Sequence, residues 1–413
     1  MVKILQNFSL KSCGIFFSVL SAAGSFLTHY AVSYSNYGLL VTARFIYGIA
    51  LESLYVVSGV ATEKWFEPSE VTLMSGLSRV EIRIVNSVMV YVLPYLYVSF
   101  NSFTAPMLEL EISGLILVVC SLAFYAVETQ LEKKQSQRQI DEDLLEGDDV
   151  QRQGFELTEL SETEGAQEGA EKPLEEKKMA PFGFKHVRLV PSLSWYCITF
   201  MGFAGATILN FTGIGVDLIS KRYSVDYLTA KNYMTIFPST CLFFTVFFLI
   251  LLNKYGYKSH SYILASVLCL ISLGTMVLLP SDQPSFLLVL SIIELSIAMA
   301  FYVATSAASV ILAAPTKASS IVVAFMAMSF NLPMFFITPL MGVLSDKRTP
   351  EAYQNCLYLL IFFAALMLLS SLLVYFTDIK QANRLLQRRA DDPWLAEYKD
   401  SLNRKVDRIL SLE

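Results

Sequence analysis

Long runs of apolar residues, separated by short polar turns, dominate this chain. A bilayer core about 30 Å thick is crossed by roughly 20 apolar residues in a helix. Only helices and closed barrels satisfy every backbone polar group in lipid, and these runs are too long and continuous for barrel strands. They predict an all-α membrane protein with ten spans, at residues 10–30, 37–60, 71–100, 106–126, 190–219, 232–252, 261–279, 285–314, 319–344 and 354–376.

Polar segments divide these spans into unequal halves. Residues 128–188 are rich in Gln, Glu, Asp, Ser and Lys, a composition that buries too little apolar surface to order itself, so we expect a disordered acidic cytoplasmic linker. It separates an incomplete amino-terminal helical half, residues 1–127 with four spans, from a carboxy-terminal six-helix half, residues 189–376. Residues 377–413 show apolar positions at helical spacing and predict an amphipathic cytoplasmic tail that packs on the protein surface.

The positive charges indicate the orientation of the spans. Lys and Arg collect on alternate connections, which marks those connections and both termini as cytoplasmic. Lys221 and Arg222 are exceptions to this pattern, as are Lys231, Lys347 and Arg348. The acidic residues are concentrated in the linker, so the net charge of -5 indicates no acidic surface and no nucleic-acid partner.

Composition and motifs exclude several classes of function. Hydrophobic residues make up 54% of the chain and charged residues 16%, which is too apolar for a soluble protein of 413 residues. The spans contain no HExxH, GxSxG or paired-Asp pattern, and the chain contains no nucleotide-binding loop. The six cysteines show no metal-binding spacing. We therefore expect neither an enzyme nor a bound cofactor or metal.

Glu52 is the most informative ionisable residue, because it lies inside the second span. At about 1.5 Å per residue it is roughly 22 Å from the start of that helix. A carboxylate at this depth faces a water-filled path in many membrane proteins, where it recognises an amine or accepts a proton. The alternative is a structural ion pair between two helices. Glu294, inside the eighth span, either lines a cavity or caps a helix.

Two arginines follow in the third span. Arg79 and Arg83 are four residues apart and share a helical face, whereas Glu81 lies on the opposite side. A guanidinium binds a carboxylate through two parallel hydrogen bonds. Arg83 is the deeper of the two, and Arg79 also fits a side chain that extends to the membrane surface. Glu52 and Arg83 together provide the opposite charges that a zwitterionic solute requires.

Particular segments resemble a known family. Residues 44–56 read RFIYGIALESLYV, and Gly76-Leu77 precede Arg83-Ile84 at a distance typical of that family. Further matches in family order are Gly213-Ile214-Gly215, Asn253-Lys254-Tyr255-Gly256, Phe325-Met326, Asn331-Leu332, Gly342 and Asp346. The chain resembles the branch of the major facilitator superfamily typified by major facilitator superfamily domain-containing protein 1, a lysosomal dipeptide transporter.

The resemblance implies a two-halved transporter that moves dipeptides out of the lysosome by alternating access. It implies uniport, substrate contacts from Glu52 and Arg83, and a glycosylated accessory membrane protein as partner. Asn331 matches the family and either joins helices or lines the cavity. In this register the chain begins at the third of twelve family helices, which fits an incomplete gene model or a reduced transporter that needs a partner. The alternatives are another organic solute or anion, or a transport-inactive scaffold or receptor.

Overall fold

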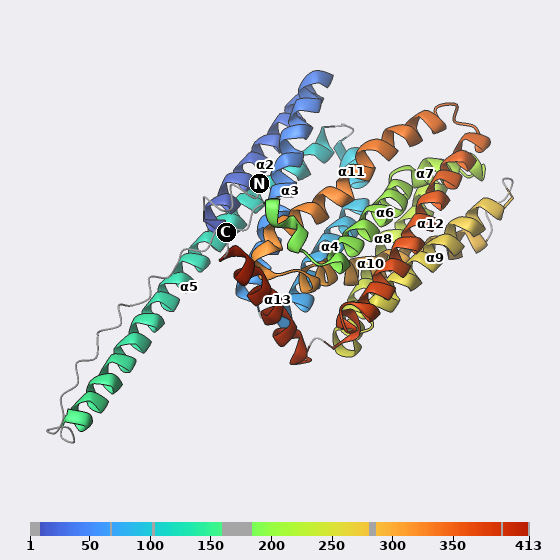
Figure 1. Cartoon of the computed structure of the whole chain (residues 1–413). Coiled ribbons are helices and arrows are strands. Elements are labelled where there is room, and N and C mark those ends of the chain that lie inside the picture. Colours follow the sequence, from blue (N-terminus) through green and yellow to red (C-terminus); the bar gives the residue numbers. More distant parts are fainter. Residues whose placement is uncertain are drawn as a thin grey trace. The chain divides into compact units, whose positions relative to one another are not determined.

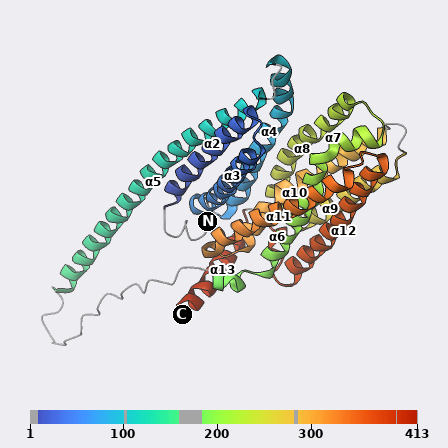
Figure 2. The same ribbon diagram turned by 90° about the horizontal axis from the view of Figure 1, so that it is seen from above.

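The computed structural model describes residues 9–66, 68–100, 104–158, 184–280, 286–389 and 391–411. All regular structure in these ranges is helical (Figure 1 and, from above, Figure 2). The long helices are α2 (Leu10–Ser33), α3 (Tyr37–Trp65), α4 (Pro68–Phe100), α5 (Ala105–Thr158), α6 (Ser192–Ala204), α7 (Asn210–Arg222), α8 (Tyr227–Tyr255), α9 (Lys258–Leu278), α10 (Phe286–Ala313), α11 (Ser319–Ser345), α12 (Pro350–Lys380) and α13 (Trp394–Leu410). The short ones are η1 (Phe184–Leu189), η2 (Gly205–Leu209), η3 (Thr316–Ala318) and η4 (Leu385–Gln387).

Nine helical segments in the described ranges are long and apolar enough to cross a bilayer. Eight are single helices, and the ninth is α6, η2 and α7 in one run, Ser192–Arg222. The predicted all-helical membrane fold is confirmed. Helix α4, predicted as the third of ten spans, has 33 residues but is not one of these nine, so that span stays a prediction.

The linker boundary predicted at residue 128 falls inside a helix. Helix α5 continues through this position and ends at Thr158. The run after residue 128 is polar, yet it is rich in Gln, Leu, Glu and Lys, which are good helix formers. A composition that predicts disorder by its low hydrophobicity is therefore helical in its first part. Residues 159–183, the rest of the predicted linker before η1, lie outside the described residues.

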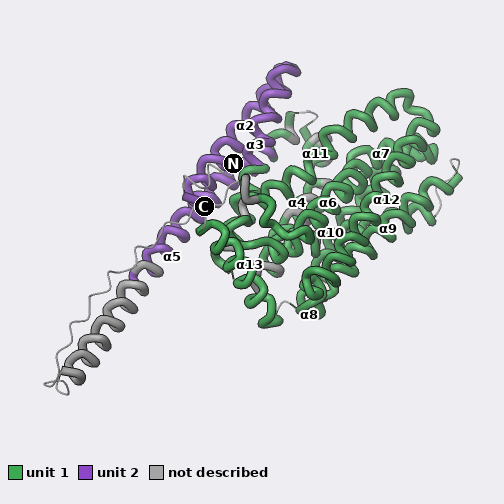
Figure 3. Tube along the Cα trace, in the orientation of Figure 1, with its two compact units in different colours: residues 1–7, 52–109, 181–413 green, residues 8–51, 110–180 purple. Residues whose placement is uncertain are grey.

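The chain divides into two compact units (Figure 3). One contains residues 1–7, 52–109 and 181–413, and the other contains residues 8–51 and 110–180. The division passes through α3 and α5, so each unit includes part of both helices. Neither unit coincides with the four-plus-six division of spans that the sequence predicts.

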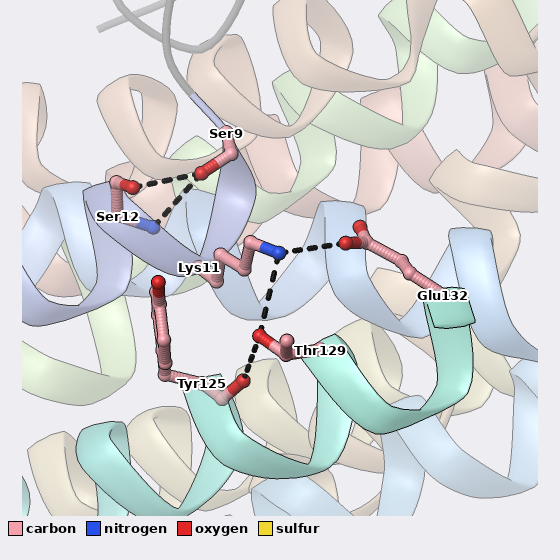
Figure 4. Close-up of polar contacts among 6 residues, drawn as sticks. All are labelled: Ser9, Lys11, Ser12, Tyr125, Thr129 and Glu132. Carbon is pink, nitrogen blue, oxygen red and sulfur yellow. Dashed lines mark hydrogen bonds and ion pairs between the residues drawn. The ribbon is translucent and has the colours of Figure 1, made fainter. Parts of the chain in front are cut away.

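In the smaller unit, polar side-chain contacts join α2 to α5 near both ends of α2. Lys11 Nζ donates to Glu132 Oε2 at 2.7 Å and to Thr129 Oγ1 at 3.3 Å, while Ser9 caps the start of α2 (Figure 4). Near the other end, His29 Nδ1 lies 2.7 Å from Glu111 Oε1. Between these pairs the backbones approach closely, because a Cβ on Gly114 would lie 3.1 Å from Ala22 Cα.

In the larger unit, α10 packs against both α8 and α9, and α12 packs against α6 and α9. Their core is aromatic as well as aliphatic: the Phe248 and Phe301 rings stack with centroids 3.7 Å apart, and Phe200 meets Tyr262 edge-on at 4.4 Å. Such buried ring pairs add stabilisation beyond the area they remove from water or lipid.

Arg222 is one of the exceptions to the predicted clustering of positive charges on cytoplasmic connections, and its contacts explain why. Its side chain is buried, with 5% of its surface exposed, and its Nη2 donates to the carbonyl oxygens of Met276, Val277 and Leu279 at 3.4, 2.9 and 3.4 Å. These carbonyls lie at the end of α9, where backbone acceptors lack partners within the helix and the helix dipole favours a cation. The positive charge of Arg222 therefore serves helix capping, not membrane orientation.

Candidate functional site

Glu52 lies near the middle of α3, and its side chain is exposed. The side chain of Asn331, on α11, forms a hydrogen bond to the Glu52 carboxylate. Asn331 also donates through Nδ2 to the carbonyl oxygen of Ala327 at 2.9 Å. A neutral amide offers two N–H donors on that nitrogen, so one bond to its own helix fixes the amide plane while the other hydrogen remains for the carboxylate.

Tyr55 lies about one turn after Glu52 on α3, and Arg79 lies about one turn before Arg83 on α4. The Arg79 guanidinium stands over the Tyr55 ring, 4.5 Å from its centroid, and its charge acts electrostatically on Glu52. The Tyr55 hydroxyl donates to Met326 Sδ at 4.0 Å. The Arg79 side chain is half-buried. Stacking on an aromatic face holds a guanidinium in place without neutralising its charge.

About one turn after Tyr55, α3 contacts α11. A Cβ placed on Gly59 would lie 2.9 Å from Val323 Cγ1, closer than side chains normally approach. Val323 is fully buried. The polar residues Glu52 and Asn331 therefore stand next to a tight apolar contact between the same two helices. By the predicted orientation, that contact is on the cytoplasmic side of Glu52.

Helix α6 supports the backbone that carries Asn331. A Cβ on Gly202 would lie 2.9 Å from the carbonyl oxygen of Ser329, and one on Gly205 would lie 3.2 Å from that of Phe330. Gly205 begins the π-helical turn η2. Such turns interrupt the regular hydrogen-bond ladder and recur at functional sites. The two glycines allow α6 and α11 to approach at the residues that precede Asn331.

The sequence-predicted site residues are only partly brought together. Glu52, Asn331 and Arg79 form one cluster from α3, α11 and α4. Arg83 lies in α4, but its side chain is outside the described residues. Glu294 is half-buried on α10, and in the part of the chain that the structure describes it makes no polar contact with the cluster.

Tyr55 and Met326 were not predicted as part of this cluster. Tyr55 follows Glu52 by three residues, which places both on one helical face, so its position was readable from the sequence. Met326 lies within a motif that matches the family, but only the fold shows that its sulfur meets the Tyr55 hydroxyl.

A separate hollow of about 710 Å³ lies in the smaller unit. Its lining includes the His29–Glu111 pair, and it contains none of the predicted site residues. The other lining residues are Phe26, Leu27, Tyr30, Ser33 and Tyr34.

The sequence pattern of the Major Facilitator Superfamily matches residues 2–335 and 199–406 of this chain. The chain belongs to the major facilitator superfamily. Proteins of this superfamily are transporters rather than enzymes, so its general function is transport across a membrane in which it is a multi-pass protein. A comparison with curated protein sequences gives no match, and no relative therefore indicates which solute this superfamily member moves.

Solved structures of other membrane transporters are similar to this fold. A structure of the proton:xylose symporter XylE with a bound bromodeoxyglucose is 14% identical, with a TM-score of 0.64 over 95% of this chain and 82% of that one. An outward-facing bacterial homologue of the iron transporter ferroportin is 9% identical, with a TM-score of 0.60 over 88% and 82%. The E. coli fucose:proton symporter FucP is 16% identical, with a TM-score of 0.53 over 88% and 85%.

Proposed function

We propose that this protein carries small zwitterionic solutes, with dipeptides as the substrate class, across a membrane by alternating access. The observation that supports this proposal is Glu52, an exposed carboxylate at mid-span that Asn331 hydrogen-bonds and on which the charge of Arg79 acts. An ionisable side chain at this depth is costly and marks a path for a polar solute or ion. Superfamily transporters bind their solutes near this depth, between the two halves.

The charges suit a solute with one free amine and one free carboxylate. Glu52 accepts hydrogen bonds from a protonated amine, and Asn331 fixes the orientation of the Glu52 carboxylate. The sequence resemblance gives the anionic end of the solute to Arg83. Arg79 presents a second guanidinium one turn away on the same face of α4, held by the Tyr55 ring. Opposite charges on neighbouring helices thus match the two ends of a dipeptide.

The compartment, the energetics and the partner are also part of the proposal. We expect uniport out of the lysosome, termini on the cytoplasmic side, and association with a glycosylated accessory membrane protein. These expectations follow from the sequence resemblance. In this orientation the contact of Gly59 with Val323 lies on the cytoplasmic side of the site, and we infer that it restricts access to the site from that side.

Transport in proteoliposomes tests the proposal. Radiolabelled alanyl-alanine is exchanged across the membrane by the unaltered protein, by Glu52→Gln, and by Glu81→Gln as a matched control with an exposed carboxylate on α4. Loss of a charged partner from a desolvated pair costs about 2–5 kcal/mol, so we expect at least a tenfold fall for Glu52→Gln and no change for Glu81→Gln.

Blocked substrates identify which end each residue binds. N-acetyl-alanyl-alanine lacks the amine, so we expect it to be a poor substrate of the unaltered protein and to lose little more in Glu52→Gln. If Glu52→Gln moves alanyl-alanine at the unaltered rate while Arg83→Ala does not, the zwitterion proposal is wrong and an organic anion is the better substrate. If neither the protein nor its variants move any dipeptide, the dipeptide proposal is wrong.

A further inference from the structure

The amphipathic helix α13 buries one face against the transmembrane helices. Leu395, Val406 and Leu410 are buried, and so is Lys399, with 8% of its surface exposed. A lysine is seldom this buried unless its ammonium has a partner. Lys399 Nζ donates to the carbonyl oxygen of Ile311 at 2.8 Å. That carbonyl is in the last turn of α10, where it also accepts a hydrogen bond from the Ala314 backbone N–H at 3.3 Å and where the helix dipole favours a cation.

The next two polar residues on this face contact the connection between α10 and α11. Asn403 accepts a hydrogen bond from the Thr316 backbone N–H at 2.9 Å and donates through Nδ2 to Thr316 Oγ1 at 3.1 Å. Asp407 forms an ion pair with Lys317 at 2.6 Å. Lys399, Asn403 and Asp407 are spaced by four residues, so they form one stripe along α13. All three residues of this polar stripe contact residues 311–317.

Helix α13 also packs against α4, and α4 packs against α10. The polar stripe contacts the connection between α10 and α11. This connection continues through η3 into α11, which contains Val323 and, about two turns later, Asn331. Helix α13 therefore contacts both α4 and η3, the short helix directly before α11. Figure 1 draws α13 in dark red at this end of the bundle. The same end includes the tight approach of Gly59 to Val323.

We propose that α13 is a latch that holds this end of the transporter closed and must release before the site opens there. The proposal rests on the alternating-access function proposed above. The physical reason is that α13 packs against α4 and is bonded to the α10–α11 connection, so it opposes their separation. On this proposal the bonds of the polar stripe break when the site opens at this end, so each of them adds to the stability of the closed state alone.

Cysteine accessibility tests the latch without any transported solute. Val323 is fully buried at the contact with α3, so a Val323→Cys reporter reacts with N-ethylmaleimide only when this end opens. The reporter is placed in a Cys120→Ser background, because Cys120 is the exposed cysteine of the described chain. A charged hydrogen bond is worth about a factor of ten or more in an equilibrium constant. We therefore expect Lys399→Met to raise the labelling rate of the reporter about tenfold in proteoliposomes.

Lys405→Met is the matched control, since Lys405 lies on the exposed face of α13 and is expected to label at the parent rate. If Lys399→Met also labels at the parent rate, the latch does not exist. A tenfold rise in both variants contradicts the proposal as well, because the effect is then not specific to the polar stripe.

A charge swap guards against a variant that merely fails to fold. Lys317→Asp and Asp407→Lys each place like charges opposite one another, and we expect each to raise the labelling rate of the reporter. The double variant restores the ion pair in reverse and returns the rate toward the parent value. A double variant that labels faster than both single variants overturns the proposal. Because no dipeptide is present, these results stand or fall independently of the transport experiment.

Discussion

The tight contact between Gly59 and Val323 predicts how a single methyl group shifts the transporter between its conformations. In Gly59→Ala the added Cβ would lie 2.9 Å from Val323 Cγ1 and 3.3 Å from Cγ2. Both distances are shorter than normal van der Waals contact. Because Val323 is fully buried, its γ-methyl groups have little space in which to avoid the added methyl group. Overpacking of this kind costs about 1–3 kcal/mol.

The cost applies only to the conformation in which α3 and α11 touch. A penalty of about 1–3 kcal/mol on one of two states changes their ratio by roughly 5- to 150-fold, in favour of the state that is open on this side. Spin labels at Ser58→Cys on α3 and Met328→Cys on α11 measure the separation of the two helices in a Cys120→Ser background, because both side chains are exposed.

We expect the distance distribution of Gly59→Ala to gain or enlarge a population at longer distance. The double variant Gly59→Ala, Val323→Ala removes both γ-methyl groups and is expected to return to the parent distribution. Gly48→Ala is the control, since a Cβ there meets no atom within 4 Å. A Gly59→Ala distribution identical to that of Gly48→Ala would refute the reasoning.

Two further predictions concern stability. Arg222→Met removes the cap of α9, so we expect the free energy of unfolding in detergent to fall by about 1.5–3 kcal/mol. Lys221→Met is the control, because Lys221 is exposed, and we expect it to leave the free energy of unfolding unchanged. Equal melting temperatures for the two variants would contradict the capping role. The Arg388 side chain and the Trp394 backbone N–H hold the pKa of Asp392 below its ordinary value. Because the pKa of Asp392 is lowered in the folded state, its ionised carboxylate stabilises the start of α13 at pH values above the ordinary Asp pKa of about 3.9. This stabilisation is lost as the pH falls through the folded-state pKa of Asp392. We therefore expect the hydrogen exchange of α13 to accelerate below about pH 4 in the parent protein, and we expect this acceleration to be absent in Asp392→Asn. An acceleration of equal size in both proteins would disprove the role of Asp392.

The membrane fold was readable from the chain because lipid imposes one strict rule on backbone polar groups. Long apolar runs allowed helices and little else, and nine described segments meet that expectation. The linker boundary was not readable in the same way. Low hydrophobicity after residue 128 predicted disorder, whereas the helix-forming residues of that stretch continue α5 to Thr158.

The site was partly readable for a similar reason. Glu52 stood out because a carboxylate is rare at that depth, and Tyr55 shares its helical face. Partners from distant helices were not readable, since neither the hydrogen bond of Asn331 to Glu52 nor the use of Arg222 as a cap of α9 follows from local spacing. Arg79 was assigned two alternatives from its sequence position, and its stacking on Tyr55 is a tertiary contact that no periodicity predicts.

The central claim is that the Glu52 carboxylate binds the amine of the solute, and solute binding tests it more directly than transport. The measurement is the affinity of purified protein for alanyl-alanine by isothermal titration calorimetry, in the unaltered protein, Glu52→Gln and the Glu81→Gln control. A charged hydrogen bond contributes about 1.5–3 kcal/mol, so we expect the dissociation constant of Glu52→Gln to rise at least tenfold and that of Glu81→Gln to stay the same. Equal affinity in Glu52→Gln and the unaltered protein would contradict the account.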